Sequence, residues 1–423
     1  MTIEPPRGSK SGFYGLRLRV LTYTALYPNI VNPLQGIFIH QRVKHLAHRP
    51  GNSVEVIAPV PYFPFWLPSP RWRQFSQIPR EEIIDGVRIH HPRYPLVPGI
   101  SMPAHGMLMY LGTRALVRRM QQERKFDCLD AHFMYPDGFA AVLLGRDLGL
   151  PAIVSARGTD INLYPSFRTI RPMLRWTLAH AAGAIAVSEG LKKKMIDLGA
   201  SEPNVRVIPN GVDVELFHRL DPNESRTKLG LPLDVPIAVS VGSLIESKGH
   251  HLLISAIQEL TRHFPKLRLY IVGEGVYRQR LEELIREKQL QDRVFLMGNR
   301  PNQELSTWFS AANISCLLSS REGWPNVVSE SLACGTPVLA TQAGGIPEII
   351  RSPELGVLVQ RNVHSIAAGL ELCLTKPWNH QEIARIGGSR SWDDVAEEVE
   401  KFLASFVGQK ANAHLTSRES FRG

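Results

Sequence analysis

The chain has few cysteines, no long apolar run and no dinucleotide-binding fingerprint. Each of these absences argues against one class of protein. The four cysteines among 423 residues form no Cys-x-x-Cys pair and have no histidine at metal-ligand spacing, which predicts reduced, mostly buried thiols. No stretch approaches the roughly 18 to 20 apolar residues that cross a bilayer, and residues 1–13 lack the apolar core of a secretory signal. No G-x-G-x-x-G follows the apolar segment Leu16–Tyr23, which argues against an NAD-dependent enzyme. We therefore expect a cytoplasmic protein.

Charge is distributed unevenly along the chain. The formal net charge is +10, and residues 1–205 carry 25 Lys and Arg against 14 Asp and Glu, so the basic excess lies in the first half. A basic surface predicts an anionic partner, such as phospholipid headgroups or a lipid diphosphate. Nucleic acid is the weaker alternative, and we do not expect it as a partner.

Two segments of the basic half bear on membrane contact. Val60–Trp72 is rich in aromatic residues and proline and contains Arg71, a composition that suits a membrane interface but also a lid or a packed surface loop. Lys192–Lys194 is expected on the exposed side of a helix, where it either adds to such a contact or is simply solvated. These features extend the expectation to peripheral association with the inner face of the membrane.

Strand and helix signals alternate along the whole chain, as is typical of doubly wound parallel sheets. The turn formers Pro209, Asn210 and Gly211, together with the shift from basic to neutral composition, predict a domain boundary at 206. The expected strands are Leu16–Tyr23, Val54–Ala58, Val87–His91, Cys128–Phe133, Ala152–Ser155, Ala182–Val187, Ile237–Val241, Leu267–Val272, Val294–Met297, Ile314–Leu318 and Pro337–Ala340. The expected helices are Ile37–Ala47, Leu108–Glu123, Glu189–Leu198, Gly249–Phe264, Tyr277–Lys288, Asn302–Ala311, Val327–Cys334 and Ser391–Phe406.

Two carboxylates flank a predicted strand-to-helix turn near the end of the second half. Glu322 follows the strand Ile314–Leu318, and Glu330 lies about one turn inside the helix Val327–Cys334. The free N–H groups at the start of that helix then fall between the two carboxylates, where an anionic diphosphate can rest. Each carboxylate can accept hydrogen bonds from the two adjacent hydroxyls of a sugar, at roughly 1.5 to 3 kcal/mol net per bond. This arrangement suits a nucleotide sugar.

The same stretch resembles a known family. Glu322 and Glu330 with seven residues between them, followed by Gly335, Pro337 and the run Gly344–Glu348, are similar to the Glu-x7-Glu signature of retaining glycosyltransferases of the GT-B fold, family 4. The resemblance implies two Rossmann-like α/β domains facing each other across a cleft, with a last helix that crosses back onto the first domain. The divisions are then an acceptor-side domain at 14–205, a donor-binding domain at 206–388 and the crossover helix at 389–407. Residues 408–423 are polar and poor in large apolar groups, which predicts a disordered tail.

The resemblance also assigns residues around the donor. Lys248 would contact the departing diphosphate at the loop that starts with Gly242, but Ser243 stands where the family has an arginine, so one expected cation is missing. The remaining implied donor residues lie in loops that follow strands or at the start of the Glu330 helix, where glycine allows close backbone approach. They are Gly273, Glu274, Gly275, Arg300, Gly323, Asn326 and Val327.

In the first domain the resemblance points to the segment after the strand Ala152–Ser155. Arg157 occupies a position where many relatives have a histidine, and because an arginine is no general base at neutral pH we expect it to hold phosphate or sugar oxygens. Asp160 is expected to orient it, or the two form a structural pair. On the acceptor side, His132 is placed to approach the acceptor hydroxyl, with a packed histidine as the alternative, and Gly36 to admit acceptor and diphosphate to the backbone.

These expectations together describe a retaining hexosyltransferase that moves a sugar from a UDP- or GDP-linked donor to a glycan acceptor. A lipid-linked precursor of a surface polysaccharide is favoured over a soluble sugar as that acceptor. No metal and no cofactor is expected, because the leaving diphosphate is stabilised by cations and helix N–H groups. A sugar-nucleotide epimerase or phosphorylase of the same shape is the alternative enzyme. A non-catalytic relative is the third reading, since Arg157 and Ser243 depart from the family pattern.

Overall fold

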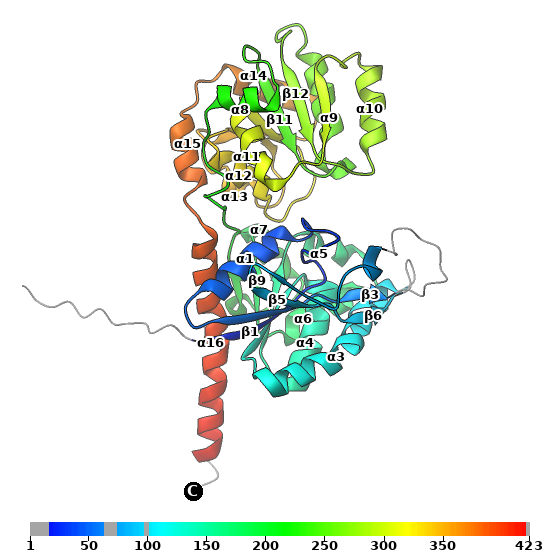
Figure 1. Ribbon diagram of the computed structural model, residues 1–423, viewed down its shortest axis with the longest axis vertical. Helices are drawn as coiled ribbons and strands as arrows, with labels where there is room; N and C mark the ends of the chain where they lie inside the picture. The colour runs from blue at the N-terminus through cyan, green and yellow to red at the C-terminus, as the bar shows by residue number, and fades with distance from the viewer. Residues whose placement is uncertain (1–16, 63–73, 97–100, 420–423) are drawn as a thin grey trace, which may run out of the picture.

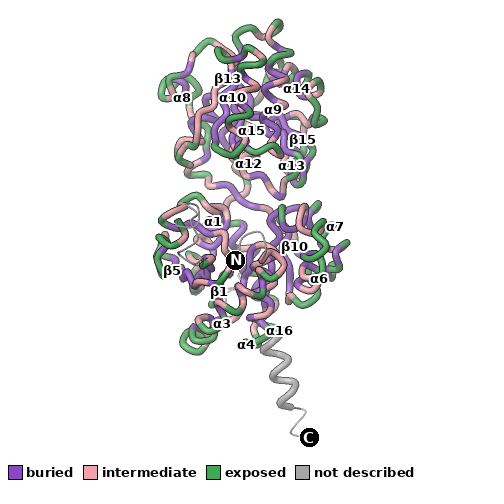
Figure 2. Tube along the Cα trace, turned by 90° about the vertical axis from the view of Figure 1, so that its right-hand side faces the viewer, coloured by how far each residue is buried: buried purple, intermediate pink, exposed green. Residues whose placement is uncertain are grey.

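The computed structural model describes residues 17–62, 74–96 and 101–419 as two α/β domains, one above the other in Figure 1, joined by a linker and by one long helix. Most of the aromatic segment Val60–Trp72 lies outside these residues, as do residues 1–13. Figure 2 shows buried residues through the middle of each domain, surrounded by exposed helices and turns. Each domain therefore has a core of its own.

The first domain is built on one eight-stranded sheet with the order β10-β9-β8-β7-β1-β2-β5-β4. All neighbours are parallel except the pair β4 and β5. Strands β7, β8 and β9 are buried along their whole length, and β1 and β2 beyond their first residue, because helices cover both faces of the sheet. The strands are β1 (Arg19–Tyr23), β2 (Ser53–Ile57), β4 (Glu81–Ile84), β5 (Val87–His90), β7 (Cys128–His132), β8 (Ala152–Ala156), β9 (Gly183–Ala186) and β10 (Val205–Val207), with β3 (Val60–Tyr62) and β6 (Arg93–Pro95) forming a small separate sheet. The helices are α1 (Ile37–His48), α3 (His105–Arg124), α4 (Phe139–Leu148), α5 (Thr159–Asn162), α6 (Arg171–His180) and α7 (Glu189–Asp197).

The second domain repeats this plan with a six-stranded parallel sheet of order β13-β12-β11-β14-β15-β16. The order reverses next to β11, and the loops on either side of such a point form a crevice at the carboxyl edge of the sheet. The strands are β11 (Ile237–Val241), β12 (Arg268–Val272), β13 (Val294–Gly298), β14 (Ile314–Leu317), β15 (Val338–Thr341) and β16 (Gly356–Val359). The helices are α8 (Pro222–Leu229), α9 (His250–Glu259), α10 (Arg278–Glu287), α11 (Asn302–Ala311), α12 (Asn326–Ala333), α13 (Ile346–Ile349), α14 (Val363–Thr375) and α15 (His380–Gly387).

The last helix, α16 (Trp392–Glu419), leaves the second domain and runs along the first (Figure 1). Its apolar residues Val395, Val399 and Leu403 join the core cluster that contains Val43 of α1. The crossover that the sequence predicted is therefore present. The helix extends to Glu419, however, which contradicts the predicted disordered tail for residues 408–419; good helix formers such as alanine, glutamine and lysine let an existing helix continue.

The predicted domain boundary at 206 falls inside β10, which pairs with β9 in the first sheet. The chain enters the second domain only after this strand.

None of the helices within 17–62, 74–96 and 101–419 is both long enough and apolar enough to span a bilayer.

Candidate functional site

Two glycine loops pack backbone against backbone at the carboxyl edge of the second sheet. Gly242 follows β11 and Gly273 follows β12, the neighbouring strand. A Cβ atom on Gly273 would lie 2.0 Å from the carbonyl oxygen of Gly242, and its φ of 148° is one that other residues rarely adopt. Leu244 donates its N–H to the carbonyl of Glu274 at 2.9 Å. The predicted donor loops therefore form one surface.

Lys248 and Glu322 meet at this edge. Lys248 ends the short turn before α9 and Glu322 lies in the loop after β14, and Nζ of the lysine is 2.6 Å from Oε1 of the glutamate. Both side chains are largely buried, at 23% and 11% exposure. Gly249 holds the lysine loop close, because its Cβ position would lie 2.3 Å from the carbonyl oxygen of Leu318. The pair places one cation and one carboxylate at the same point.

A cavity of about 350 Å³ surrounds this pair and is lined by residues of both domains. Four of the predicted site residues line it: Arg157 from the first domain, and Lys248, Glu322 and Gly323 from the second. The other residues that line the cavity are Gly158, Thr159, Asn162, Leu163, Ile245, Ser247 and Arg321. The structure thus places the sequence-predicted catalytic pair at an interdomain site.

The domains touch directly beside the cavity. A Cβ on Gly323 would lie 2.0 Å from the carbonyl oxygen of Arg157, so only glycine fits at this contact. Asn162 of the first domain donates Nδ2 to the carbonyl oxygen of Glu322 at 2.9 Å. On the far side, Glu348 of the second domain accepts the N–H groups of Glu189 at 2.9 Å and Gly190 at 3.1 Å, which caps the start of α7.

Arg157 is held by neutral groups. Its Nη1 donates to Oδ1 of Asn210 at 3.1 Å, and its Nη2 binds Nδ1 of His132. Burial and the nearby charge of Arg42 lower the pKa of Arg157 to about 9, so its guanidinium is still charged at neutral pH. Asn210 in turn donates to Oδ1 of Asn326, the first residue of α12, at 2.9 Å. The linker asparagine therefore connects the arginine to the donor-side helix.

The sequence predicted that Asp160 would orient Arg157 or pair with it. The structure shows no hydrogen bond or ion pair between the Asp160 carboxylate and the guanidinium of Arg157. Its carboxylate accepts the backbone N–H groups of Arg157 at 3.1 Å, Gly158 at 2.8 Å and Met134 at 2.9 Å. The side chain is fully buried, and burial raises the pKa of its carboxyl while these hydrogen bonds oppose the rise. Asp160 thus shapes the loop around the arginine from beneath and does not line the cavity.

His132 lies beneath Arg157 and is also fully buried. Burial, and then the charge of Arg157, lower the pKa of its imidazole to about 3, so the ring is neutral. Its Nε2 is 3.4 Å from Oδ2 of Asp130. It is absent from the described residues that line the cavity, and this placement matches the packed histidine that the sequence analysis left open.

A buried ion pair between α1 and the sheet lies beside His132. Arg42 of α1 donates Nη2 to both carboxylate oxygens of Asp130, at 2.6 and 2.8 Å, and Nη1 to Oγ of Ser155 at 2.9 Å. Burial alone would raise the pKa of Asp130, but Arg42, His132 and Arg157 together outweigh it and bring the pKa down to about 2. The sequence did not predict four of the residues around the site: Arg42, Asp130, Asn162 and Asn210. Only Asn210 gave a signal, as part of the turn-forming Pro-Asn-Gly run, and that run was interpreted as a domain boundary.

Glu330 is partly buried within α12. Burial, and then the like charge of Asp213, raise the pKa of its carboxyl to about 8. Glu330 does not line the cavity around Glu322, and neither do Gly242, Ser243, Asn326 or Val327. These residues occupy the same edge of the sheet, and their contact with a donor stays a prediction.

Three further predicted residues lie at the ends of strands. Glu274 binds Arg278 at 2.7 Å, and Gly275 packs against the carbonyl oxygen of Leu244; Arg300 follows β13. On the first domain, Gly36 precedes α1 with φ 67°, and a Cβ there would lie 2.3 Å from the carbonyl oxygen of Leu26. The glycine at 36 is therefore required by a contact within the domain, and an approach of acceptor to its backbone stays a prediction.

The fold and the interdomain cavity define a two-domain glycosyltransferase of the GT-B class, and comparison with known proteins agrees. Residues 35–216 match the family model described as Glycosyltransferase Family 4, and residues 221–390 match that described as Glycosyl transferases group 1. The chain belongs to the glycosyl transferases of group 1. The predicted family, fold class and enzyme class, a hexosyltransferase, are confirmed.

The relatives and solved structures that resemble this chain cover most of it. The putative teichuronic acid biosynthesis glycosyltransferase TuaC of Bacillus subtilis is 28% identical over 94% of this chain and 97% of its own length. The putative colanic acid biosynthesis glycosyltransferase WcaL of Salmonella typhimurium is 28% identical over 72% of each chain. The structure of HepE from Anabaena in complex with UDP superposes with a TM-score of 0.65 at 18% identity, covering 95% of this chain and 100% of that one.

Proposed function

We propose that this protein is a retaining, metal-independent glycosyltransferase that moves a hexose from a nucleotide sugar to a glycan or lipid-linked acceptor in the synthesis of a surface polysaccharide. The observation that carries the proposal is the Lys248–Glu322 pair, 2.6 Å apart in a cavity lined by both domains. The relatives named for teichuronic and colanic acid synthesis support the polysaccharide, and HepE, solved with UDP and with UDP-glucose, supports a nucleotide-sugar donor.

In the proposed transfer, Lys248 binds the diphosphate and Glu322 binds the sugar. Lys248 turns from Glu322 to the diphosphate, where a charge-assisted hydrogen bond contributes about 1.5 to 3 kcal/mol. The bond between the anomeric carbon and the β-phosphate oxygen breaks, and its electron pair leaves with the phosphate. The acceptor hydroxyl oxygen bonds to the anomeric carbon on the same face, and its proton passes to the leaving phosphate oxygen. Glu322 accepts hydrogen bonds from sugar hydroxyls and holds the ring in place.

In this proposal Arg157 is the second cation of the donor site, after Lys248. Its guanidinium is charged at neutral pH and lines the same cavity as Lys248, while Ser243 offers no charge where the family has an arginine. Arg157 then binds phosphate or sugar oxygens from the acceptor side. It contacts the donor from the side of the cavity that the first domain supplies.

Peripheral membrane association is the second part of the proposal. The first domain carries the basic excess, and it exposes large apolar side chains at Ile30 (73%), Leu34 (51%) and Tyr62 (54%). Apolar side chains beside basic ones suit binding to an anionic bilayer surface. Such a location would bring a lipid-linked acceptor to the enzyme.

Incubation of the purified chain with UDP- and GDP-hexoses and a bacterial membrane extract tests the function. Labelled hexose should appear in lipid or polymer, transfer should persist with EDTA, and NMR of the product should show the anomeric configuration of the donor. Conversion of the nucleotide sugar to its epimer without transfer would identify an epimerase instead. Binding of the donor without any turnover would identify a non-catalytic relative.

A further inference from the structure

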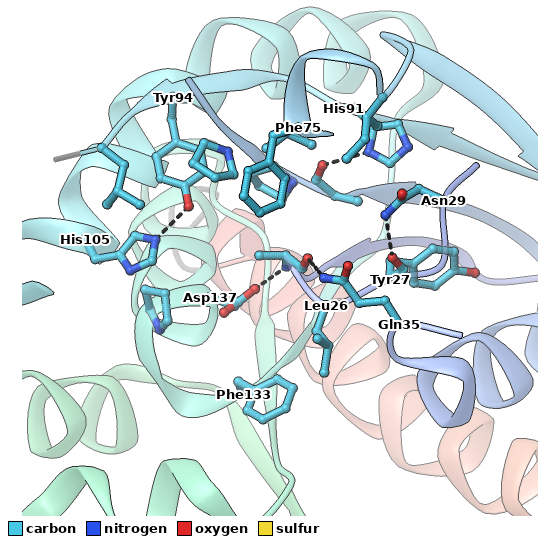
Figure 3. Close-up of a pocket in the computed structure, with 18 of the residues that line it drawn as sticks. Leu26, Tyr27, Asn29, Gln35, Phe75, His91, Tyr94, His105, Phe133 and Asp137 are labelled. Atoms are coloured by element: carbon cyan, nitrogen blue, oxygen red, sulfur yellow. Dashed lines mark hydrogen bonds between the residues drawn. The ribbon is translucent and has the colours of Figure 1, made fainter. Parts of the chain in front are cut away.

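A second pocket of about 340 Å³ lies in the first domain, at the carboxyl ends of β1, β2 and β7 (Figure 3). It neighbours the interdomain cavity: Tyr164 lines the pocket, and Leu163, the residue before it, lines the cavity. Aromatic and aliphatic side chains make up most of its wall, among them Tyr27, Phe75 and Tyr94. Neither the proposed donor site nor any predicted residue accounts for this pocket.

Three of the tyrosines around the pocket use their hydroxyl groups within the protein. Tyr27 binds Nδ1 of His40 at 2.8 Å, Tyr94 binds Nε2 of His105 at 2.7 Å, and Tyr135 donates to the carbonyl oxygen of Met102 at 2.6 Å. Their rings are therefore fixed and are left to present apolar surface. Fixed aromatic rings can pack against the C–H faces of a sugar as well as against a hydrocarbon.

Two polar side chains on the wall form hydrogen bonds with the backbone of Ala25. Asp137 accepts the N–H of Ala25 through Oδ1, and Gln35 donates Nε2 to the carbonyl oxygen of Ala25 at 3.4 Å (Figure 3). Within the described part of the chain, Oδ2 of Asp137 and Oε1 of Gln35 receive no hydrogen bond from another residue. Oε1 of Gln35 is an acceptor, and so is Oδ2 of Asp137 in its ionised form, so both complement a ligand that donates O–H groups.

The described lining of the pocket offers little positive charge to an anion. No lysine or arginine is found among the described residues that line it, and burial lowers the pKa of His105 to about 4, so this imidazole is neutral. Burial raises the pKa of Asp137 to about 7, with Asp160 adding a like charge. A phosphate or uronate here would find no lysine or arginine among the described lining residues and would lie near the carboxyl group of Asp137. A hydrocarbon chain would cover Asp137 and Gln35 without replacing their contact with water, which is also unfavourable.

We propose that this pocket binds an uncharged sugar residue of the acceptor glycan, with the sugar against the aromatic wall and its hydroxyl groups donating to Asp137 and Gln35. The inference rests on the proposed function, because it supplies the acceptor side of that reaction. It assigns Asp137 and Gln35 as residues that select a neutral sugar over an acidic one. Phosphates of a lipid-linked acceptor then lie outside this pocket.

Saturation-transfer NMR on the full chain tests the selection with three probes at millimolar concentration: methyl α-D-glucopyranoside, the methyl glycoside of glucuronic acid, and farnesol. The neutral glycoside should bind and the glucuronoside should bind at least tenfold more weakly. Asp137→Asn keeps the shape of the side chain, and Gln35→Leu changes a partly exposed residue that the core does not need. Each should weaken the neutral glycoside at least tenfold, whereas Gln279→Leu, on the exposed face of α10, should leave it unchanged.

Equal or tighter binding of the glucuronoside would overturn the inference, as would binding of farnesol in competition with the sugar, or no effect of Gln35→Leu. Absence of binding by the neutral glycoside would also overturn it. Consumption of nucleotide sugar by the same preparations separates this failure from failure of the proposed function. If the donor is still consumed, only the assignment of the pocket is lost.

Discussion

Nζ of Lys248 lies 2.6 Å from Oε1 of Glu322, and this contact joins two loops that are 74 residues apart in the sequence. The loops follow β11 and β14, which are neighbours in the sheet, so the parallel topology brings them to the same edge. The two side chains hold each other in place in the free protein. A donor would replace the contact, with its diphosphate taking the lysine and its sugar taking the glutamate.

Lys248→Met should weaken the binding of UDP or GDP by about tenfold or more, since a charge-assisted hydrogen bond contributes about 1.5 to 3 kcal/mol. Calorimetric titration of both nucleotides measures this and also identifies the base. Lys266→Met, on an exposed lysine at 70% exposure, is the control and should not change the affinity. Equal affinity of the Lys248 variant and the wild type would remove the lysine from the diphosphate site.

Asn210→Ala should destabilise the contact between the domains. It leaves Nη1 of Arg157 and Oδ1 of Asn326 without their partner, and an unpaired buried polar group costs about 1 to 3 kcal/mol. Urea denaturation followed by circular dichroism measures the loss. Asn223→Ala, at an exposed position in α8, should stay within about 0.5 kcal/mol of the wild type. A bridge without energetic value would make the two variants indistinguishable.

Arg42→Met should lower the free energy of unfolding of the first domain by about 3 to 5 kcal/mol, because it leaves the carboxylate of Asp130 buried without its cation. Arg88→Met is the matched control: Arg88 is 3.9 Å from Glu81 and both are exposed, so at most about 1 kcal/mol is expected. Chemical denaturation of both variants gives the comparison. Similar values for the two would mean that the buried pair contributes little.

Glu330 should make stability depend on pH. Its carboxyl has a pKa of about 8 in the folded protein against 4.5 ordinarily, so between these values the folded state holds the proton more tightly. The stability of the wild type relative to Glu330→Gln should therefore fall as pH rises from about 5 to 8, by at most about 1.4 kcal/mol per pH unit.

Thermal unfolding of both proteins across this pH range measures the difference. Glu371→Gln, at an exposed residue, should run parallel to the wild type. A difference between wild type and Glu330→Gln that does not change with pH would mean that the carboxylate is solvated in the folded protein.

Regular elements were predictable from the sequence where their patterns are strong. The strand Ile237–Val241 and the helix Asn302–Ala311 have the predicted bounds, because apolar runs and periodic apolar positions define them. The helix α4 (Phe139–Leu148) was not predicted: it is mostly buried, so no polar stripe distinguishes it from a strand. The short strands β3 and β6, of three residues each, gave no signal.

The site was predictable in its motif but not in its contacts. Spacing placed Lys248 and Glu322 at strand ends, and the parallel sheet then brings such ends together. Nothing in the sequence connects Arg42 with Asp130, which lies 88 residues away, or Arg157 with Asn210. These pairs depend on how the helices pack on the sheet, so Asp160 was wrongly assigned to the guanidinium that Asn210 binds.

The most direct measurement is hexose transfer from a nucleotide sugar to membrane extract by the wild type and by Glu322→Gln, with circular dichroism to show that both are folded. The account predicts transfer by the wild type and a loss of several orders of magnitude in the variant, with the same unfolding temperature within a few degrees. Near-normal turnover by Glu322→Gln would contradict it.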